Sequence, residues 1–158
     1  MTSGSSFLEF GAFFLLFVLA WVGSGYLIAQ MGGWKALGQM FPRKKRLEAS
    51  KIRFCSLSFV GKWVFPINYA SCVDVAVSDD EIFLSVFPLF RAGHPPLEIP
   101  WKRVDECHRK DGLWLGSETA IKVGVGGGSS QTIRFYGKAG KNVFEKWTRR
   151  GWDDQSDS

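Results

Sequence analysis

The chain has 158 residues, a formal net charge of +5 and 46% hydrophobic residues, which leaves room for one membrane span and one modest domain. The excess charge is confined to residues 1–53, where seven basic and two acidic side chains give +5, whereas residues 54–158 carry 13 of each sign. A nucleic-acid-binding domain carries its basic residues on its folded surface, so nucleic acid is not an expected partner.

Residues 10–31 form an uninterrupted apolar segment without a charged side chain. As a helix, these 22 residues reach about 33 Å, enough to cross a hydrocarbon core of about 30 Å. The segment predicts a transmembrane helix over 10–31, behind a short polar N-terminus over 1–9. A buried core helix and a cleaved signal peptide are the alternatives. The length of the charge-free run disfavours the first, and the lack of a preceding Lys or Arg disfavours the second.

All the basic residues near this segment follow it, which predicts an N-terminus outside and a C-terminal domain in the cytoplasm. The three cysteines show no paired spacing, as expected for free thiols in a reducing compartment. The expected partner of the helix is the lipid bilayer. Gly25 and Ala29 are small residues four positions apart, a spacing that lets two helices pack closely. A homo-oligomer formed through the span is therefore a further option.

Residues 32–50 are predicted to form an interfacial, basic juxtamembrane linker. Trp34, Leu37 and Phe41 fall on one side of a short helix, and Trp favours the headgroup level of a membrane. The alternative is a short connector packed on the domain. In the first interpretation, the residues that contact the membrane surface are Trp34, Phe41, Arg43, Lys44, Lys45 and Arg46.

From Ile52 onward the apolar residues recur with a period of two, which is typical of β-strands. Strands are predicted near 52–54, 69–77, 82–90, 97–101, 113–115, 120–125 and 131–136, and a helix over 142–150 that Gly151 ends. The fold class is therefore mainly β: a small β roll or barrel over 51–150 with a C-terminal helix. An acidic, disordered tail is predicted over 151–158.

A segment within this domain resembles one found in a group of uncharacterised bacterial single-span membrane proteins with a small β domain. In that group an aromatic-Arg-x-Gly-His-Pro-Pro sequence leads into an Ile-Pro-Trp strand. The strand order and terminal helix also resemble pleckstrin-homology-like and GRAM-like domains. The resemblance implies that architecture and a bacterial source, so the expected location is a bacterial inner (cytoplasmic) membrane. It does not imply any particular activity, because those relatives have no assigned function. The matching positions are Arg91, Gly93, His94, Pro95, Pro96, Pro100 and Trp101.

Pleckstrin-homology domains that bind phosphoinositides use a basic loop between their first two strands. The corresponding segment, 60–68, has Lys62 as its single charge, so phosphoinositide binding is not implied. The same fold also binds peptides and proteins, and fold alone does not decide between these functions.

No motif in the chain predicts a catalytic residue, a cofactor or a metal. His94 is expected to make one hydrogen bond within a rigid loop, because no second ligand lies at a metal-like spacing. Cys107 and His108 would point to opposite faces of a strand. The glycine-rich segment 124–130 lacks the following helix of a phosphate-binding loop, so it is expected to connect two strands.

These observations predict a membrane-anchored, non-enzymatic module that binds an unidentified protein or peptide partner. The alternative is a domain that senses anionic lipid at the membrane surface, through Trp34, Phe41 and the basic residues 43–46.

Overall fold

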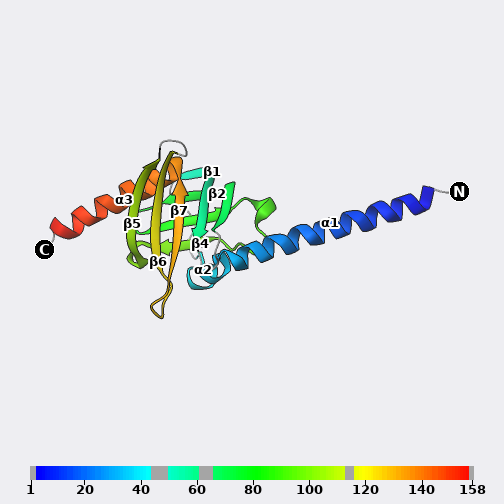
Figure 1. The fold of residues 1–158 in the computed structure, drawn as a ribbon, viewed down its shortest axis with the longest axis horizontal. Helices are drawn as coiled ribbons and strands as arrows, with labels where there is room; N and C mark the ends of the chain where they lie inside the picture. Colours follow the sequence, from blue (N-terminus) through cyan, green and yellow to red (C-terminus); the bar gives the residue numbers. More distant parts are fainter. Residues whose placement is uncertain (1–2, 44–49, 61–65, 113–115, 157–158) are drawn as a thin grey trace.

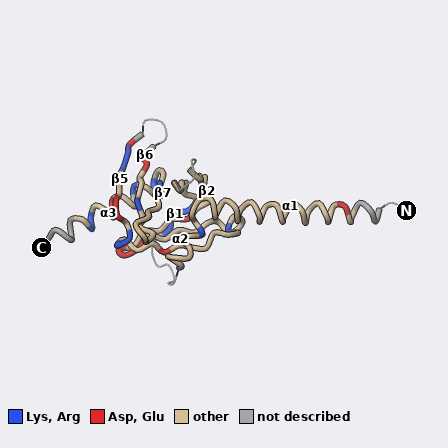
Figure 2. Tube along the Cα trace, turned by 60° about the horizontal axis from the view of Figure 1, so that its bottom comes forward, with Lys and Arg blue, Asp and Glu red and all other residues tan. Residues whose placement is uncertain are grey.

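One long helix projects from a β domain in the computed structural model, which describes residues 3–43, 50–60, 66–112 and 116–156 (Figure 1). Helix α1 runs from Ser3 to Met31, so it begins within the predicted polar N-terminus. Its segment Phe7–Met31 is long and apolar enough to cross a membrane, by length and composition, and the domain covers little of it. Figure 2 shows almost no charged residues along α1, whereas the domain carries both basic and acidic residues.

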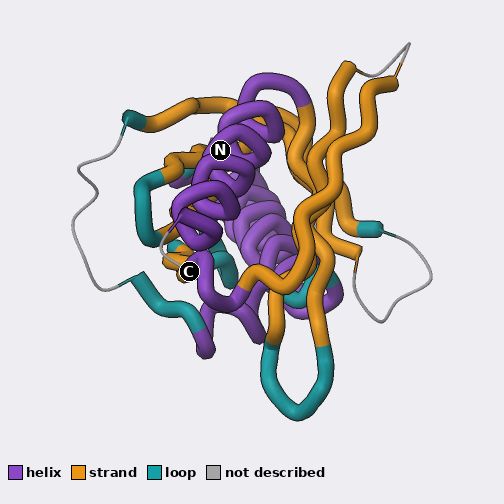
Figure 3. The backbone as a smooth tube through the Cα atoms, turned by 90° about the vertical axis from the view of Figure 1, so that its left-hand side faces the viewer, coloured by secondary structure: helices purple, strands orange, loops and turns teal. Residues whose placement is uncertain are grey.

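Seven antiparallel strands form one sheet in the order β4-β3-β2-β1-β7-β6-β5. They are β1 (Lys51–Val60), β2 (Ile67–Val77), β3 (Glu81–Val86), β4 (Leu97–Pro100), β5 (Val104–Gly112), β6 (Gly116–Gly124) and β7 (Ser130–Tyr136). The sheet curls into a half-barrel, seen end-on in Figure 3. This confirms the predicted mainly β layout between an N-terminal apolar helix and a C-terminal helix.

The core lies on the concave side of this sheet. Strand residues alternate between the two faces, and the apolar set on one face is buried, as predicted for the strand over 69–77. The side chains with at most 1% of their surface exposed include Leu57, Phe59, Val73, Val75, Ile82, Leu84, Ile99, Ile121, Ile133 and Phe135.

Helix α3 (Gly137–Ser156) covers the open side of the half-barrel. Ala139 and Val143 are buried against the sheet, and Trp147 packs against Trp101 with ring centroids 6.2 Å apart. The helix continues through Gly151, so the prediction that Gly151 ends it is wrong, and the segment predicted to be disordered is helical as far as Ser156. A single glycine costs a helix only about 1 kcal/mol.

Irregularities in β1 and β2 turn one large side chain outward. The pairing register of these strands shifts on both sides of Cys55. Phe54 has φ +56° and Ser71 has φ +49°, conformations that are uncommon for residues other than glycine. Phe54 is consequently 59% exposed. The sequence pattern, in which Ile52 and Phe54 alternate with Arg53, predicts that Phe54 faces inward with Ile52.

The segment 82–90 is only partly a strand. β3 ends at Val86, and Pro88–Phe90 form a short 3-10 helix, η1, because proline has no N–H for the sheet and fixes φ. Strand β5 was not predicted, since its sequence is mostly polar. The strand predicted over 113–115 lies outside the described residues.

Candidate functional site

A short helix, α2 (Trp34–Met40), forms the corner between α1 and the domain. It follows Gly33, whose φ of +81° is a left-handed conformation that glycine adopts without steric cost. Trp34 and Leu37 enter the domain core, where they are 0% and 1% exposed. Burial of each such side chain contributes about 1.5–3 kcal/mol to stability. Of the two interpretations of this segment, the structure therefore shows the short connector packed on the domain.

The prediction that Trp34 and Phe41 contact the membrane surface is therefore wrong, because both side chains are buried within the domain. Arg43 is exposed, and its backbone N–H donates to the carbonyl of Pro96 at 3.3 Å. The other cations of the cluster, 44–46, lie outside the described residues, so their contact with headgroups stays a prediction.

The loop 91–96, which holds most of the resemblance motif, is fitted closely against both helices. Gly93 has φ +75°, and a Cβ added there would lie 2.9 Å from Tyr26 Cα. A Cβ added to Gly38 would lie 2.3 Å from Pro95 Cγ. Neither position has room for a larger residue, so this part of the motif seats the loop on α1 and α2.

The other motif residues occupy different places. Arg91 is exposed beside η1, and Pro100 is the last residue of β4. Trp101 is 2% exposed and its indole N–H donates to the carbonyl of Ser78 at 3.1 Å. Pro100 pairs with Glu81 of β3, and Trp101 packs against Trp147 of α3.

His94 is 3% exposed and uses both ring nitrogens, where the sequence predicted one hydrogen bond. Nδ1 lies 2.8 Å from the carbonyl oxygen of Ala92, which only accepts, so Nδ1 is the protonated nitrogen. Nε2 lies 3.0 Å from the Tyr69 hydroxyl oxygen and accepts a hydrogen bond from this hydroxyl. Burial lowers the pKa of His94 and raises the pKa of Tyr69, and both groups are therefore neutral near pH 7.

Trp34, Phe59, Tyr69 and His94 form one cluster of rings, which we call the aromatic joint. The Trp34 ring centroid lies 5.1–5.4 Å from the other three, and its indole N–H donates to the Pro95 carbonyl at 2.7 Å. Such ring pairs each contribute about 0.5–1.5 kcal/mol beyond burial. The joint connects α2, β1, β2 and the 91–96 loop, and thereby fixes the end of α1 to the domain.

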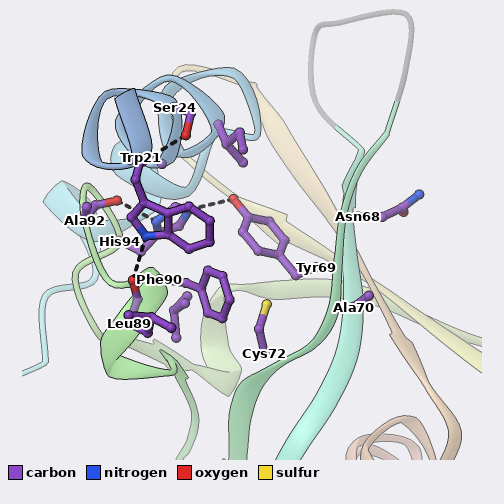
Figure 4. Close-up of a pocket in the computed structure, with 13 residues that line it drawn as sticks. Trp21, Ser24, Asn68, Tyr69, Ala70, Cys72, Leu89, Phe90, Ala92 and His94 are labelled. Atoms are coloured by element: carbon purple, nitrogen blue, oxygen red, sulfur yellow. Dashed lines mark hydrogen bonds between the residues drawn. The ribbon is translucent and has the colours of Figure 1, made fainter. Parts of the chain in front are cut away.

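A groove of about 250 Å³ opens between α1 and β2 beside the joint (Figure 4). One wall comes from α1, with Trp21, Gly25 and Ile28, and the opposite wall from β2, with Ala70 and Cys72. None of the described residues that line it carries a charge. The arrangement is suited to an apolar ligand, since the polar pair at its floor, Tyr69 and His94, is already hydrogen-bonded.

Cys72 offers no evident nucleophilic chemistry in this groove. Burial raises the pKa of its thiol, so the thiolate is scarce at neutral pH. The pKa of Cys107 is likewise raised, to about 11, by burial.

Exposed apolar side chains flank the mouth of the groove. We call Phe54, Phe87, Leu89 and Phe90 the apolar ridge; they are 59%, 40%, 63% and 40% exposed. Phe54 packs on Phe87 with centroids 5.9 Å apart, and Phe90 packs on Trp21 at 5.4 Å. The ridge is therefore continuous with the apolar surface of α1.

The remaining sequence candidates lie apart from the groove. His108 is exposed beside Glu106, while Cys107 packs toward the core, so the two residues point to opposite faces as predicted. The segment 124–130 contains the β6–β7 turn, in which Gly126, Gly127 and Gly128 all have positive φ. Among the residues that the structure describes, no group of three or more His, Cys, Asp or Glu could hold a metal ion.

The groove and the ridge were not predicted from the sequence. In the sequence, Tyr69 and Cys72 are indistinguishable from ordinary strand residues. Trp21 is one of several aromatic residues in the apolar segment. The signal that was available is Leu89-Phe90, two large apolar residues that directly follow Pro88, where a strand is disfavoured.

Comparison with known proteins adds no family to this description. No protein-family model matches the chain, and no curated protein matches it. The resemblance to pleckstrin-homology-like and GRAM-like domains stays a prediction.

Proposed function

We propose that this chain is a single-pass membrane protein whose β domain is a non-enzymatic module that binds a protein or peptide partner. In this proposal α1 crosses a bacterial inner membrane with its N-terminus outside, because the neighbouring cations all follow α1 and favour the cytoplasmic side. The exposed Phe13, Leu16 and other side chains of α1 support anchoring, since water does not favour so long an apolar surface.

The observation that carries the binding proposal is that the two edges of the sheet differ. The β4 edge is covered by the segment that follows α2: Phe41 O accepts from the Glu98 N–H at 3.0 Å, and Pro42 forms a bridge with Leu97. Among the described residues, no strand pairs with the outer edge of β5. An uncovered edge offers backbone donors and acceptors to an added strand.

β5 is also well placed and suitably charged to receive such a strand. It lies on the side of the domain opposite α1 (Figure 1), which in our proposal faces the cytoplasm. Its nine residues carry side chains of both charges, including Glu106, Arg109 and Lys110. Charges on an edge strand disfavour indiscriminate pairing and leave room for a partner with complementary charge.

The non-enzymatic part of the proposal is supported by the way in which the groove's polar groups are used. Both nitrogens of His94 are bonded within the protein, as is the Tyr69 hydroxyl, so the buried pair serves the joint. The alternative of anionic-lipid sensing loses two of its six contacts, because Trp34 and Phe41 are buried.

A photo-crosslinking amino acid at His108, compared with one at Lys138 on α3, tests the binding proposal in native membranes. Both positions are exposed, so they differ mainly in their distance from the β5 edge. We expect a discrete protein adduct from position 108 that position 138 does not give. Equal adducts from both positions, or adducts from position 138 alone, would reject β5 as the binding edge.

Orientation is tested separately with Lys141→Cys, which places an exposed thiol on α3. A membrane-impermeant maleimide should leave this thiol unlabelled in intact cells and label it after lysis. Labelling in intact cells would reverse the proposed orientation.

A further inference from the structure

We propose that the apolar ridge is immersed in the cytoplasmic leaflet and that the groove beside it holds an acyl chain of a membrane phospholipid. This inference rests on the membrane anchoring proposed above. It does not depend on the binding edge at β5, which lies on the opposite side of the domain.

The length of α1 that is free of the domain requires this immersion. Contacts with the domain begin at Trp21, whose indole N–H donates to the Leu89 carbonyl at 3.2 Å. The segment before it, Phe7 to Ala20, is apolar except for Glu9 near its outer end. It reaches only about 21 Å as a helix, short of the roughly 30 Å of a hydrocarbon core. The bilayer must therefore extend over the part of α1 on which η1 packs.

The inner boundary of the hydrocarbon is marked by Tyr26 and Lys35. The 20 residues from Phe7 to Tyr26, apolar except for Glu9 at their outer end, reach about 30 Å, which matches the core thickness. The Tyr26 hydroxyl lies 2.7 Å from Lys35 Nζ, and this ammonium lies 4.6 Å from the Tyr26 ring centroid. Tyr and Lys are side chains that favour the membrane interface.

Trp21 lies five residues before Tyr26, or about 7.5 Å deeper in the membrane. Phe90 stacks on Trp21, so the ridge lies at a similar depth, within the roughly 5–10 Å to which amphipathic segments insert. Exposed Arg91 follows the ridge directly and can reach headgroup phosphates. Immersion explains why the domain leaves Phe54, Phe87, Leu89 and Phe90 uncovered.

The groove then opens toward the hydrocarbon and not toward water. The space lies between Ile28 of α1 and the Tyr69 and Cys72 side chains of β2, which point toward α1 (Figure 4). Its volume of about 250 Å³ lies below the roughly 300–1,000 Å³ of common ligand pockets, which suits part of one hydrocarbon chain. Because no described lining residue is charged, a chain from the bilayer fits the site better than a headgroup does.

Reconstitution of the full chain into vesicles of phosphatidylcholine that carries a diazirine on one acyl chain tests this inference. After irradiation, lipid adducts are mapped by mass spectrometry on two peptides, one from α1 and one from β2. We expect adducts on both peptides. Ile28→Trp, which adds a ring at an exposed α1 position that lines the groove, should abolish the β2 adduct and leave the α1 adduct unchanged.

The matched control is Leu16→Trp, which adds the same ring to an exposed position of α1 away from the groove; it should keep both adducts. Adducts on α1 without adducts on β2 would overturn the lipid site and leave anchoring intact. A β2 adduct that survives Ile28→Trp would also overturn it, since the lipid would then bind elsewhere on β2. A chain without adducts on α1 would contradict the anchoring itself.

Discussion

The side of the domain that meets α1 and the side that carries β5 are held together by different interactions. On the α1 side the aromatic joint is buried and uncharged near pH 7. On the opposite side, exposed ion pairs such as Arg134–Glu118 and Lys146–Asp79 connect neighbouring elements. Burial fixes one arrangement, whereas exposed ion pairs contribute little and rearrange readily. We therefore expect surface substitutions on the β5 side to cost less stability than substitutions in the joint.

The largest effect should follow from removing the centre of the joint. Trp34→Ala deletes a fully buried ring together with its hydrogen bond to Pro95, and we expect a loss of about 3–5 kcal/mol in the free energy of unfolding. Denaturant unfolding of the full chain in detergent, followed by near-UV circular dichroism, measures it. Lys110→Ala on exposed β5 should stay within about 0.5 kcal/mol. Similar losses in both variants would contradict the proposed difference in stability between the α1 side and the β5 side of the domain.

Gly93→Ala tests the fit between the loop and α1, with Gly127→Ala as its matched control. Both glycines have positive φ, +75° and +60°, but only Gly93 has a neighbour within reach of an added Cβ, Tyr26 Cα at 2.9 Å. The backbone conformation alone costs roughly 1–2 kcal/mol in either variant. The clash should add about 1–3 kcal/mol at Gly93, measured by the same unfolding assay. Equal costs would show that the loop is not tightly seated.

The third prediction concerns the dependence of stability on pH and the buried histidine, His94. Burial holds the pKa of His94 below its usual value of 6.5, so the unfolded chain takes up this proton first as the pH falls. Stability is then complete above about pH 6.5 and decreases as the pH falls toward the folded pKa, by at most about 1.4 kcal/mol per pH unit for one proton.

We therefore expect His94→Gln to flatten the dependence of stability on pH between 7.5 and 5. Thermal unfolding at several pH values measures the slope in the wild type and in the variant. A wild-type slope in His94→Gln would show that the buried histidine does not titrate as proposed.

Most of the fold could be predicted because its signals are local. The period-two pattern around Val73 and Val75 and the charge-free run before Met31 identify a buried strand and an apolar helix without knowledge of their neighbours. Strand β5 could not be predicted in this way. It is an edge strand whose polar residues face solvent, and its pairing with β6 is set by the hairpin and not by burial.

The site was less accessible to sequence reasoning, because its residues come from separated segments. A short helix with Trp34, Leu37 and Phe41 on one side has the same sequence pattern whether that side meets lipid or a protein core. In the structure, this side of the helix is buried in the protein core. The groove and the ridge depend on how η1 packs against α1, which is a tertiary contact between residues 68 positions apart.

The smallest effect should come from the ion pair between β6 and β7. Arg134 Nε lies 3.4 Å from a carboxylate oxygen of Glu118, and both side chains are partly exposed. Arg134→Gln keeps a polar side chain and removes the charge, so we expect a loss of about 0–1 kcal/mol at low salt. The loss should shrink at 1 M salt, where the Debye length falls to about 3 Å. Denaturant unfolding at both salt concentrations measures it, with Lys110→Gln on β5 as the control for a change of net charge. A loss comparable to that of Trp34→Ala, or one that persists at high salt, would mean that the β5 side is held as rigidly as the joint, and the contrast between the two sides would fail.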